Sequence, residues 1–383
     1  MKTKFYSSIK EVPNIDWTSM NIGDNPLFSF QIFELLENIQ MAHTFCYITI
    51  ENDIQEVIGF ARTQLIPFNS SQILSQHFPC DANPNLKQLL LQKIKVSILV
   101  CGSLFACGEN GFCYNPNKIN SAKAYQVLGK ALKLASKKHF KNKPTFILIK
   151  EFFPETTPNS DHIKTENYSD LFIDANMQMH IPSHWNNFEN YLKELRTKFR
   201  SKAKKVIKKS KDIELVDFNS QDILKYQNEI DSLYSSILKK AYFKIGQLNA
   251  FAFAEIKQVL QEQFIFTGYF FEGRLIGFSS GILTKNKLEA FHVGYNEEFK
   301  NSNNIYQSML YNYLKDAIDF KVSQLQLGRT SETIKSGIGA KPTHMKLYIR
   351  HRNSIINFIL SPVTKWVKPS INEIRTPFKK QVN

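Results

Sequence analysis

The sequence predicts an α/β (α+β) fold built from two successive units, each a mixed, twisted sheet flanked by helices. The chain has 383 residues, which is more than one hydrophobic core usually serves. Its apolar content of 43% is close to that of soluble globular proteins. Strand-like and helix-like runs also occur twice along the chain in a similar order, and such alternation is typical of helices packed on sheets.

The first cycle of elements opens with a helix in which Phe30, Phe33 and Leu36 recur at helical spacing. Two strand-like runs separated by a polar turn follow it and predict a hairpin. A longer strand, an amphipathic helix and a closing strand complete the cycle. The expected elements are a helix at 25–40, strands at 43–51, 56–66 and 93–107, a helix at 121–139 and a strand at 144–152.

The second cycle repeats the order of hairpin, strand, helix and strand, which favours an internal duplication. Its expected elements are a strand at 177–181, a helix from Trp185 to about Lys211, helices within 222–263, three strands within 264–296, a helix at 304–320 and a strand at 322–328. We therefore predict an N-terminal domain at 1–175, a C-terminal domain at 176–352 and a basic extension at 353–383.

The extension differs in character from the rest of the chain. It is basic, contains Trp366 and the short apolar run INFIL, and is interrupted by prolines. It is either a packed extension or an interfacial segment that touches lipid.

Two features predict a cytoplasmic protein, with peripheral contact at an inner membrane as an open alternative. The N-terminus has lysines but no apolar core of a signal peptide, and no apolar run reaches the roughly 18 residues that span a membrane. The five cysteines lie between Cys46 and Cys113 without the C-x-x-C spacing of zinc or redox sites. We expect them to be reduced, buried side chains.

The excess positive charge lies in the second half of the chain. Residues 1–180 carry 17 Lys and Arg against 16 Asp and Glu, whereas the remainder carries 32 against 18. Ten of the nineteen residues from Lys193 to Lys211 are basic, and apolar residues recur among them at helical spacing. Such a helix is either a solvated surface or a binding surface for phosphates of a nucleic acid, a carrier protein or a lipid.

One candidate site lies on the strand that contains His292. In a regular strand His292 and Phe291 face opposite sides of the sheet. A neutral His292 could accept a proton from an attacking ammonium, or it could be a structural residue. Asn304, with Asn303 as the alternative, is expected to cap the following helix, whose first backbone N–H groups would suit a phosphate.

The most distinctive stretch runs from Gly328 to Pro342 and follows a strand end, where loops of α/β folds collect ligand groups. Arg329 offers a planar fork to a phosphate or carboxylate, Lys335 a compact positive charge, and Glu332 a hydrogen-bonding carboxylate. An ordinary turn is the alternative. The sequence contains no Walker loop, H-E-x-x-H, G-x-S-x-G or G-x-G-x-x-G motif, so these classes of site have no support.

Three of these stretches together resemble the FemAB-like members of the GNAT acyltransferase superfamily. The run W-x-x-F-x-x-Y-L-x-x-L-x-x-K-x-R from Trp185 is similar to the entry to their second domain. The segment G-R-x-x-x-x-x-K-x-x-x-G-A-x-P from Gly328 resembles their late loop, and GRLIGFSSGIL with HVGYN resembles their core hairpin. The N-terminal NPLFSFQIFELLE is similar to the start of peptidoglycan-biosynthesis-related members.

The resemblance implies two tandem GNAT-like domains and transfer of an acyl group to a primary amine, without a covalent enzyme intermediate. In that fold two strands part, and the carbonyl of the donor lies between them. By position, Arg329, Glu332, Lys335 and Asn304 would contact the substrates. His292 or Tyr295 would relay the proton, and Tyr306 is a further candidate acid.

The resemblance leaves the donor open, because neither half contains the Q/R-x-x-G-x-G/A loop typical of enzymes that use coenzyme A. The expected donor is a thioester, either acyl-coenzyme A or an acyl carrier protein, and the acceptor is a small or lipid-linked amine such as a bacterial cell-envelope precursor. The alternatives are a Fem-type transferase that uses aminoacyl-tRNA and a non-catalytic nucleic-acid-binding protein.

Overall fold

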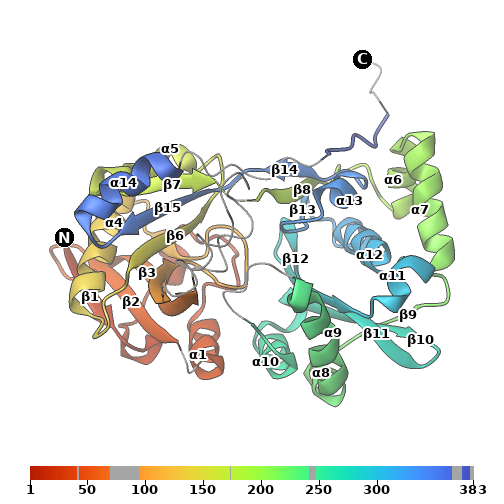
Figure 1. The fold of residues 1–383 in the computed structure, drawn as a ribbon, viewed down its shortest axis with the longest axis horizontal. Helices are drawn as coiled ribbons and strands as arrows, with labels where there is room; N and C mark the ends of the chain where they lie inside the picture. The colour runs from red at the N-terminus through yellow and green to blue at the C-terminus, as the bar shows by residue number, and fades with distance from the viewer. Residues whose placement is uncertain (41–42, 70–94, 173, 241–246, 365–372, 380–383) are drawn as a thin grey trace, which may run out of the picture. The chain divides into compact units, whose positions relative to one another are not determined.

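The chain divides into two compact units in a computed structural model that describes residues 1–40, 43–69, 95–172, 174–240, 247–364 and 373–379 (Figure 1). Unit 1 comprises Met1–Ile173, Tyr242–Gly246 and His344–Pro369, and unit 2 comprises Asp174–Ala241, Gln247–Thr343 and Ser370–Asn383. Each unit contains one mixed sheet with its own buried cores.

The sheet of unit 1 has the strand order β1-β2-β3-β4-β6-β15-β7, and β5 pairs with β3. Its strands are β1 (Lys2–Tyr6), β2 (Thr44–Glu51), β3 (Val57–Asn69), β4 (Lys95–Cys101), β5 (Phe112–Tyr114), β6 (Phe146–Phe152), β7 (Ser169–Phe172) and β15 (Lys346–His351). The β4–β6 pair is parallel, and the other pairs are antiparallel. A parallel pair requires a crossover connection, which α4 (Ser121–Lys138) supplies.

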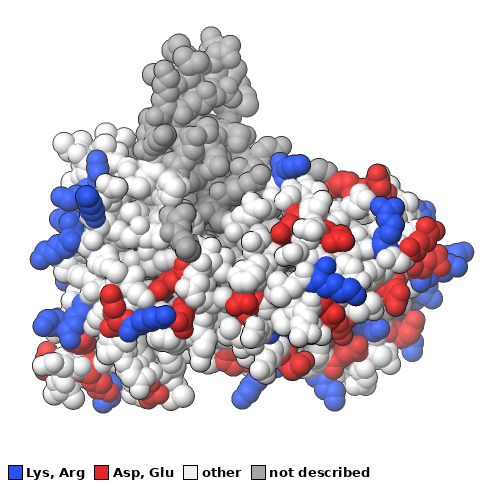
Figure 2. Space-filling view, turned by 90° about the horizontal axis from the view of Figure 1, so that it is seen from below, with Lys and Arg blue, Asp and Glu red and all other residues white. Residues whose placement is uncertain are grey.

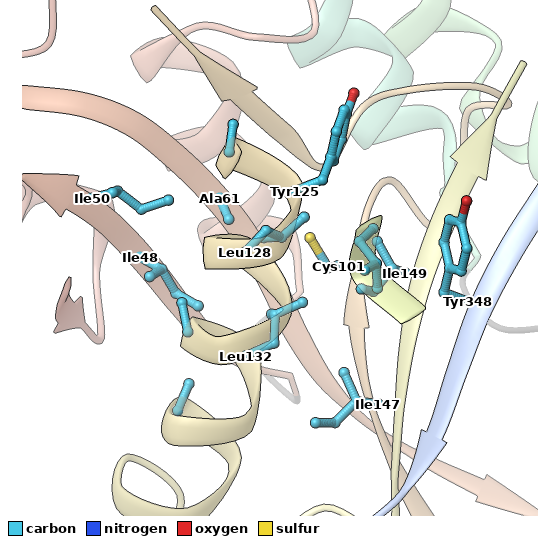
Figure 3. Packing of buried hydrophobic residues seen from close by; sticks show 14 of the residues in the cluster. Ile48, Ile50, Ala61, Cys101, Tyr125, Leu128, Leu132, Ile147, Ile149 and Tyr348 are labelled. Atoms are coloured by element: carbon cyan, nitrogen blue, oxygen red, sulfur yellow. The ribbon is translucent and has the colours of Figure 1, made fainter. Parts of the chain in front are cut away.

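Helix α4 covers one face of this sheet. Asn120 caps its first turn by accepting a hydrogen bond from the Lys123 N–H. Leu128 and Leu132 are fully buried against the strands, and burial of one such side chain contributes about 1.5–3 kcal/mol. Figure 3 shows them among Ile48, Cys101, Ile147 and Ile149. The remaining helices of unit 1 are α1 (Phe30–Ile39), α5 (Thr157–Ser160) and α14 (Ser354–Thr364).

Three of the cysteines are buried as expected, whereas Cys107 is half-buried in a loop and Cys80 lies outside the described residues. Cys46, Cys101 and Cys113 lie on strands, are buried, and form no disulfide. Burial raises the pKa of the Cys46 and Cys101 thiols to about 12, so they stay protonated.

The sheet of unit 2 has the strand order β14-β8-β13-β12-β11-β10-β9. Its strands are β8 (Asn176–His180), β9 (Glu214–Asp217), β10 (Phe264–Phe271), β11 (Arg274–Leu283), β12 (Lys287–Tyr295), β13 (Gln324–Gln326) and β14 (Lys341–Thr343). Again one pair, β12–β13, is parallel. Helix α12 (Ile305–Asp319) connects the two strands.

Helices cover both faces of this second sheet. Helices α6 (Phe188–Glu194), α7 (Thr197–Lys209) and α12 share one apolar core with Leu288 and Leu325 of the sheet. On the opposite face, α9 (Gln227–Lys240) packs on β12 and α10 (Ala250–Leu260) on β10. Gly294 permits this packing, because a Cβ there would lie 2.9 Å from the Tyr234 nitrogen of α9. The remaining helices are α8 (Ser220–Lys225), α11 (Glu298–Ser302) and α13 (Glu332–Ser336).

The two sheets share one pattern, as the sequence predicted. In unit 1 the neighbours β2, β3 and β4 are followed by α4 and then by β6, which pairs in parallel with β4. In unit 2 the neighbours β10, β11 and β12 are followed by α12 and then by β13, which pairs in parallel with β12. The fold class is therefore confirmed: two mixed sheets flanked by helices, in tandem.

The membership of the last strands differs from the predicted domain limits. The domain expected at 176–352 includes β15, but β15 pairs with β6 and β7 in the sheet of unit 1. The extension expected at 353–383 is divided between the units, because α14 lies with unit 1 and residues 373–379 with unit 2. Backbone pairing between distant segments determines this arrangement, and hydrophobic periodicity carries no information about it.

The helix expected from Trp185 to about Lys211 is two helices. Leu195 has an extended backbone and forms an isolated β-bridge with Phe378, so α6 ends before it and α7 begins after Arg196. The ring of Phe378 packs on Trp185, and it lies so close to Gly339 that a Cβ there would meet it at 2.5 Å. The chain between the helices thus forms part of the contact with the C-terminal segment.

Asp316 of α12 provides a test of the buried charges in unit 2. Burial and the nearby carboxylates of Asp217 and Asp319 raise the pKa of Asp316 to about 7, against about 3.9 in an unfolded chain. At pH values between these two pKa values the native state binds more protons than the unfolded state. The free energy of unfolding that depends on Asp316 therefore falls as the pH rises. Asp316→Asn should therefore raise the melting temperature at about pH 8 and change it little at about pH 4. The exposed Asp212→Asn of the same unit is the control, because Asp212 is not among the charges that shift the pKa of Asp316, and an equal gain of Asp316→Asn at both pH values would contradict the assignment.

Candidate active site

The parallel ladder between β12 and β13 is short. It has three rungs, which pair Lys287 with Gln324, Leu288 with Leu325 and Glu289 with Gln326. Strand β13 ends at Gln326, whereas β12 continues to Tyr295. Within the described chain, the edge of β12 beyond Glu289 therefore faces no neighbouring strand.

The backbone of this open edge presents hydrogen-bond donors. The Asn296 N–H donates to the Ile276 carbonyl of β11, so the pair next to it, Tyr295 and Gly277, is a non-hydrogen-bonded pair of the antiparallel ladder. The N–H groups of Tyr295 and, two residues earlier, Val293 therefore point away from β11. The hydroxyl of Ser236 donates to the Tyr295 carbonyl, so α9 caps one carbonyl of the same edge.

A β-bulge in β12 lies beside the open edge. Val293 pairs with Ser279 and Ala290 with Gly281, so Phe291 and His292 together oppose Ser280. The Ser280 hydroxyl replaces the missing ladder partner: it accepts from the His292 N–H at 3.1 Å and donates to the His292 carbonyl at 3.0 Å. This bulge corrects the expectation that Phe291 and His292 face opposite sides. Both rings lie on the sheet face that α9 and α10 cover: Phe291 contacts Phe264, and His292 contacts Phe253.

His292 lies in an aromatic surrounding. Its Nδ1 is 3.0 Å from the Tyr234 hydroxyl of α9, and its Nε2 is buried with no hydrogen-bond partner among the described residues. Burial lowers the pKa of His292 to about 3, so the ring is neutral at physiological pH. This surrounding favours a hydrogen-bonding role for His292 over a role as a base.

Tyr295 and Tyr306 lie together on the opposite face of β12, toward α12. Their rings are 5.7 Å apart, and both contact the apolar cluster around Ile305 and Met309. Burial raises the pKa of Tyr295 to about 12. Burial also raises the pKa of Tyr306, and a hydrogen bond with the Ser331 hydroxyl partly offsets that increase. Both phenols therefore stay protonated at neutral pH and are able to donate a proton.

The loop after β13 is held by Lys335. This residue is 4% exposed, and its ammonium group donates to the carbonyls of Arg329 at 2.6 Å and of Gly328 at 3.3 Å. These two bonds hold Gly328 and Arg329 to α13, and the expected contact of Lys335 with an anionic substrate stays a prediction. Glu332 is likewise buried, at the start of α13, whereas Arg329 is half-buried. The loop is fixed to β8 through the Met177 N–H, which donates to the Gly328 carbonyl.

Asn304 occupies the expected position at the start of α12, but its side chain makes no capping bond. Its backbone is left-handed, with φ of 52°, and the short helix α11 fills the place of a glycine-rich loop before it. Thr330 and Ser331 have left-handed backbones in the loop after β13. This loop carries the Ser331 hydroxyl, which lies close to Tyr306.

A polar face of the sheet was missed by the sequence analysis. Glu289 is 5% exposed, lies on the last rung of the β12–β13 ladder and receives an ion pair from Lys287 at 3.0 Å. Beside it, Asn176 donates to Gln326, and both are buried. The Asn176 Oδ1 and Gln178 Nε2 atoms have no partner among the described residues. The alternation of Met and polar residues in MQMHI and of Leu and Gln in QLQL was the signal for this face.

The basic helix is exposed, as predicted. On α7 the exposed cations are Lys198, Lys202, Lys204, Lys205, Lys208 and Lys209. No carboxylate of the described chain forms an ion pair with them. The Lys209 ammonium donates to the Asn301 carbonyl, which places the end of α7 next to α11, the short helix that precedes α12. On the face drawn in Figure 2, by contrast, basic and acidic side chains are interspersed.

The described residues contain neither a candidate metal site nor a candidate membrane-spanning helix. The described residues contain no group of three or more His, Cys, Asp or Glu side chains placed to hold a metal ion. None of the described helices combines the length and apolarity needed to cross a bilayer.

The arrangement of the two sheets matches solved structures of tandem proteins. FemX superposes with a TM-score of 0.52 at 11% identity, covering 94% of this chain and 100% of the other. L-PGS from Bacillus licheniformis gives a TM-score of 0.51 at 9% identity, covering 91% and 99%. The chain shares the two-domain fold of FemX and L-PGS.

The remaining comparisons show weaker similarity or none. A tandem GNAT protein from the clavulanic acid biosynthesis pathway gives a TM-score of 0.46 at 10% identity, covering 82% of this chain and 84% of the other. No protein-family model matches the sequence, and no curated protein matches it. At these identities the likeness to solved structures is one of fold.

Ser280 allows a test of the bulge. Ser280→Ala leaves the His292 N–H and carbonyl without their partner, and such unsatisfied buried groups cost about 1–3 kcal/mol. We expect a lower midpoint in urea unfolding with an unchanged slope. Ser279→Ala is the matched control, because the Ser279 hydroxyl contacts the Tyr269 hydroxyl instead of the backbone of the bulge. Equal losses in the two variants would mean that Ser280 does not support the bulge.

Proposed function

We propose that unit 2 transfers an acyl or aminoacyl group to a primary amine at the open edge of β12. The end of the parallel ladder at Glu289 and Gln326 carries this proposal, because it leaves the N–H groups of Val293 and Tyr295 without a neighbouring strand. A carbonyl oxygen that accepts a hydrogen bond from such a fixed N–H is polarised, and the negative charge that develops on it is stabilised. The FemAB-like fold is consistent with this chemistry.

Glu289 supplies the base that His292 does not. Its carboxylate lies on the last rung before the open edge, on the sheet face that also carries His292. A carboxylate and the acceptor atom Oδ1 of Asn176 attract the positive charge and the hydrogens of an ammonium group. His292 and Tyr234 then border the acceptor side as neutral, hydrogen-bonding groups.

The proposed reaction is a direct displacement. The amine loses its extra proton to Glu289, and its nitrogen attacks the carbonyl carbon of the donor to form a C–N bond. The C–S bond of a thioester, or the C–O bond of an ester, breaks. The leaving sulfur or oxygen takes a proton from Tyr306 or Tyr295, whose raised pKa values keep them protonated beforehand.

The donor is proposed to be anionic. Acyl-coenzyme A, an acyl carrier protein and aminoacyl-tRNA all carry phosphates, and α7 presents unpaired lysines beside α11. The length of this cationic helix favours a large polyanion, so aminoacyl-tRNA is the second candidate. The proposed acceptor is an amine of a lipid or of a cell-envelope precursor, and Arg329 is the side chain proposed to contact its anionic part.

The helices between β9 and β10 bear on the choice between these donors. A long helical hairpin inserted in this region would favour aminoacyl-tRNA as the donor. In the described residues α8, α9 and α10 are separate short helices packed on the sheet. The basic helix α7 is therefore the feature that supports a tRNA donor.

Replacement of Glu289 tests the proposed reaction. The purified chain is incubated with acyl-coenzyme A, an acylated carrier protein or aminoacyl-tRNA and a set of primary amines, and N-acyl products are measured by mass spectrometry. Glu289→Gln should lower product formation by about 100-fold or more while thermal unfolding stays similar, because a positioned base contributes 10²–10⁴-fold.

The control for this experiment is Glu298→Gln, an exposed carboxylate on α11 of the same unit. Wild-type activity in Glu289→Gln would remove Glu289 from the reaction. If the chain forms no product with any donor but binds RNA of every kind, and loses it in salt, the binding-protein alternative is favoured.

The lysines of α7 are tested with the donor that proves active. Lys204→Gln combined with Lys208→Gln should raise the KM for that donor about five- to tenfold, leave kcat unchanged, and reduce the dependence of binding on salt. The exposed lysines Lys315 and Lys321 serve as a matched control pair. An unchanged KM and salt dependence would show that α7 does not contact the donor.

A further inference from the structure

Helix α14 of unit 1 buries Asn357 and Thr364 and exposes its large apolar side chains. Asn357 is 8% exposed; its amide donates to the Asn167 carbonyl at 2.9 Å, and its Oδ1 accepts from the His351 N–H at 2.8 Å. The outward side chains are Ile355, Ile356, Phe358 and Ile359, with exposed fractions of 73%, 48%, 82% and 59%. Polar bonds therefore hold the helix against β7 and β15 (Figure 1). Its apolar side chains consequently face the solvent.

This apolar surface is out of proportion to the rest of the molecule. Single exposed apolar residues are normal, but four large ones on an eleven-residue helix form a contiguous patch. The side chains also protrude: Phe358 and Ile355 keep most of their surface free. A protruding apolar ridge inserts readily into a deformable layer, whereas a protein partner must offer a groove of matching shape.

The surroundings of this ridge are cationic. Arg352 precedes α14; its N–H donates to the Thr145 carbonyl at 2.9 Å and its guanidinium to the Lys143 carbonyl. The first turn of α14 therefore lies beside the loop after α4. The exposed cations of this region are Lys137, Lys138, Lys141, Lys143 and Arg352.

Acidic residues are missing from the same stretches of sequence. Neither residues 111–150 nor residues 333–372 contain an Asp or Glu. The segment 161–170, which α14 contacts through Asn167, has its carboxylates paired: Asp161 with Lys346, Glu166 with Lys133 and Asp170 with Lys164. The exposed Glu11 lies near His139 at the end of α4, and the five cations outnumber it. A surface that carries negative charge therefore meets net attraction.

We propose that α14 docks unit 1 on an anionic membrane surface, with Ile355, Ile356, Phe358 and Ile359 inserted among the lipid chains and the neighbouring cations on the headgroups. The apolar ridge supplies burial, and each lysine or arginine near a negatively charged leaflet adds to the affinity. This inference is independent of the reaction proposed for unit 2, because every residue that carries it belongs to unit 1.

Vesicle sedimentation of the full chain tests the proposal. The wild-type chain should bind vesicles of phosphatidylcholine with roughly one third phosphatidylglycerol, and bind much less to phosphatidylcholine alone. Phe358→Asp should weaken binding to the mixed vesicles by at least about tenfold, since a large buried ring is replaced by a charge. Lys141→Gln combined with Lys143→Gln should weaken it by about fivefold for each charge removed, and only on anionic vesicles.

Ile54→Asp is the matched control, because Ile54 is 80% exposed on a turn of unit 1 away from α14. It should bind vesicles like the wild type, and circular dichroism melts should show that both Asp variants fold. Lack of vesicle binding by the wild type, or equal binding by Phe358→Asp, would overturn the proposal. A wild-type dimer that Phe358→Asp dissociates, without vesicle binding, would assign the ridge to a second copy of the chain.

Discussion

The arrangement of unit 2 depends on how far β12 and β13 pair. Two parallel strands joined through a helix can hydrogen-bond along their whole length, but here the ladder has three rungs, and β12 extends beyond it. Continued pairing would satisfy every N–H of β12 within the sheet and leave none for a ligand. Because the ladder ends at Glu289, the same strand supplies both a stable core beside α12 and a row of outward-facing backbone groups. Unit 1 shares the parallel pair and the connecting helix, but its β4 ends at the last rung, Cys101, so the free extension is a feature of unit 2.

The bulge separates the chemistry of the two faces of β12. A regular strand would place Phe291 and His292 on opposite sides, but the extra residue opposite Ser280 directs both toward α9 and α10. One face then carries Glu289 and the neutral imidazole, and the other carries the protonated phenols of Tyr295 and Tyr306. A proton acceptor and proton donors on opposite sides of one open edge suit a displacement in which a proton leaves the attacking group and another reaches the leaving group.

Much of this fold follows from local sequence. Some features depend only on residues that are neighbours in the chain. They are the apolar periodicity of α4 and α12, the turn at Glu272 and Gly273 and the lysine density of α7. The pairing of β15 with β6 and the bridge of Leu195 to Phe378 join segments far apart in sequence, and their hydrogen bonds are between backbone groups. Such contacts leave no residue pattern to read, which is why the domain membership of residues 344–364 and the break between α6 and α7 were not predicted.

In the candidate site too, the sequence indicates the residue types but not the contacts that their polar atoms make. Residue type identified Lys335 and His292 as charged or titratable groups, but function depends on where their polar atoms are directed. The Lys335 ammonium is bonded to the carbonyls of Gly328 and Arg329, and aromatic burial keeps His292 neutral. Glu289 attracted no notice in the sequence because a lone glutamate in a strand is ordinary. Its burial on the last rung of the ladder is the reason that we propose it as the group that accepts the proton of an amine.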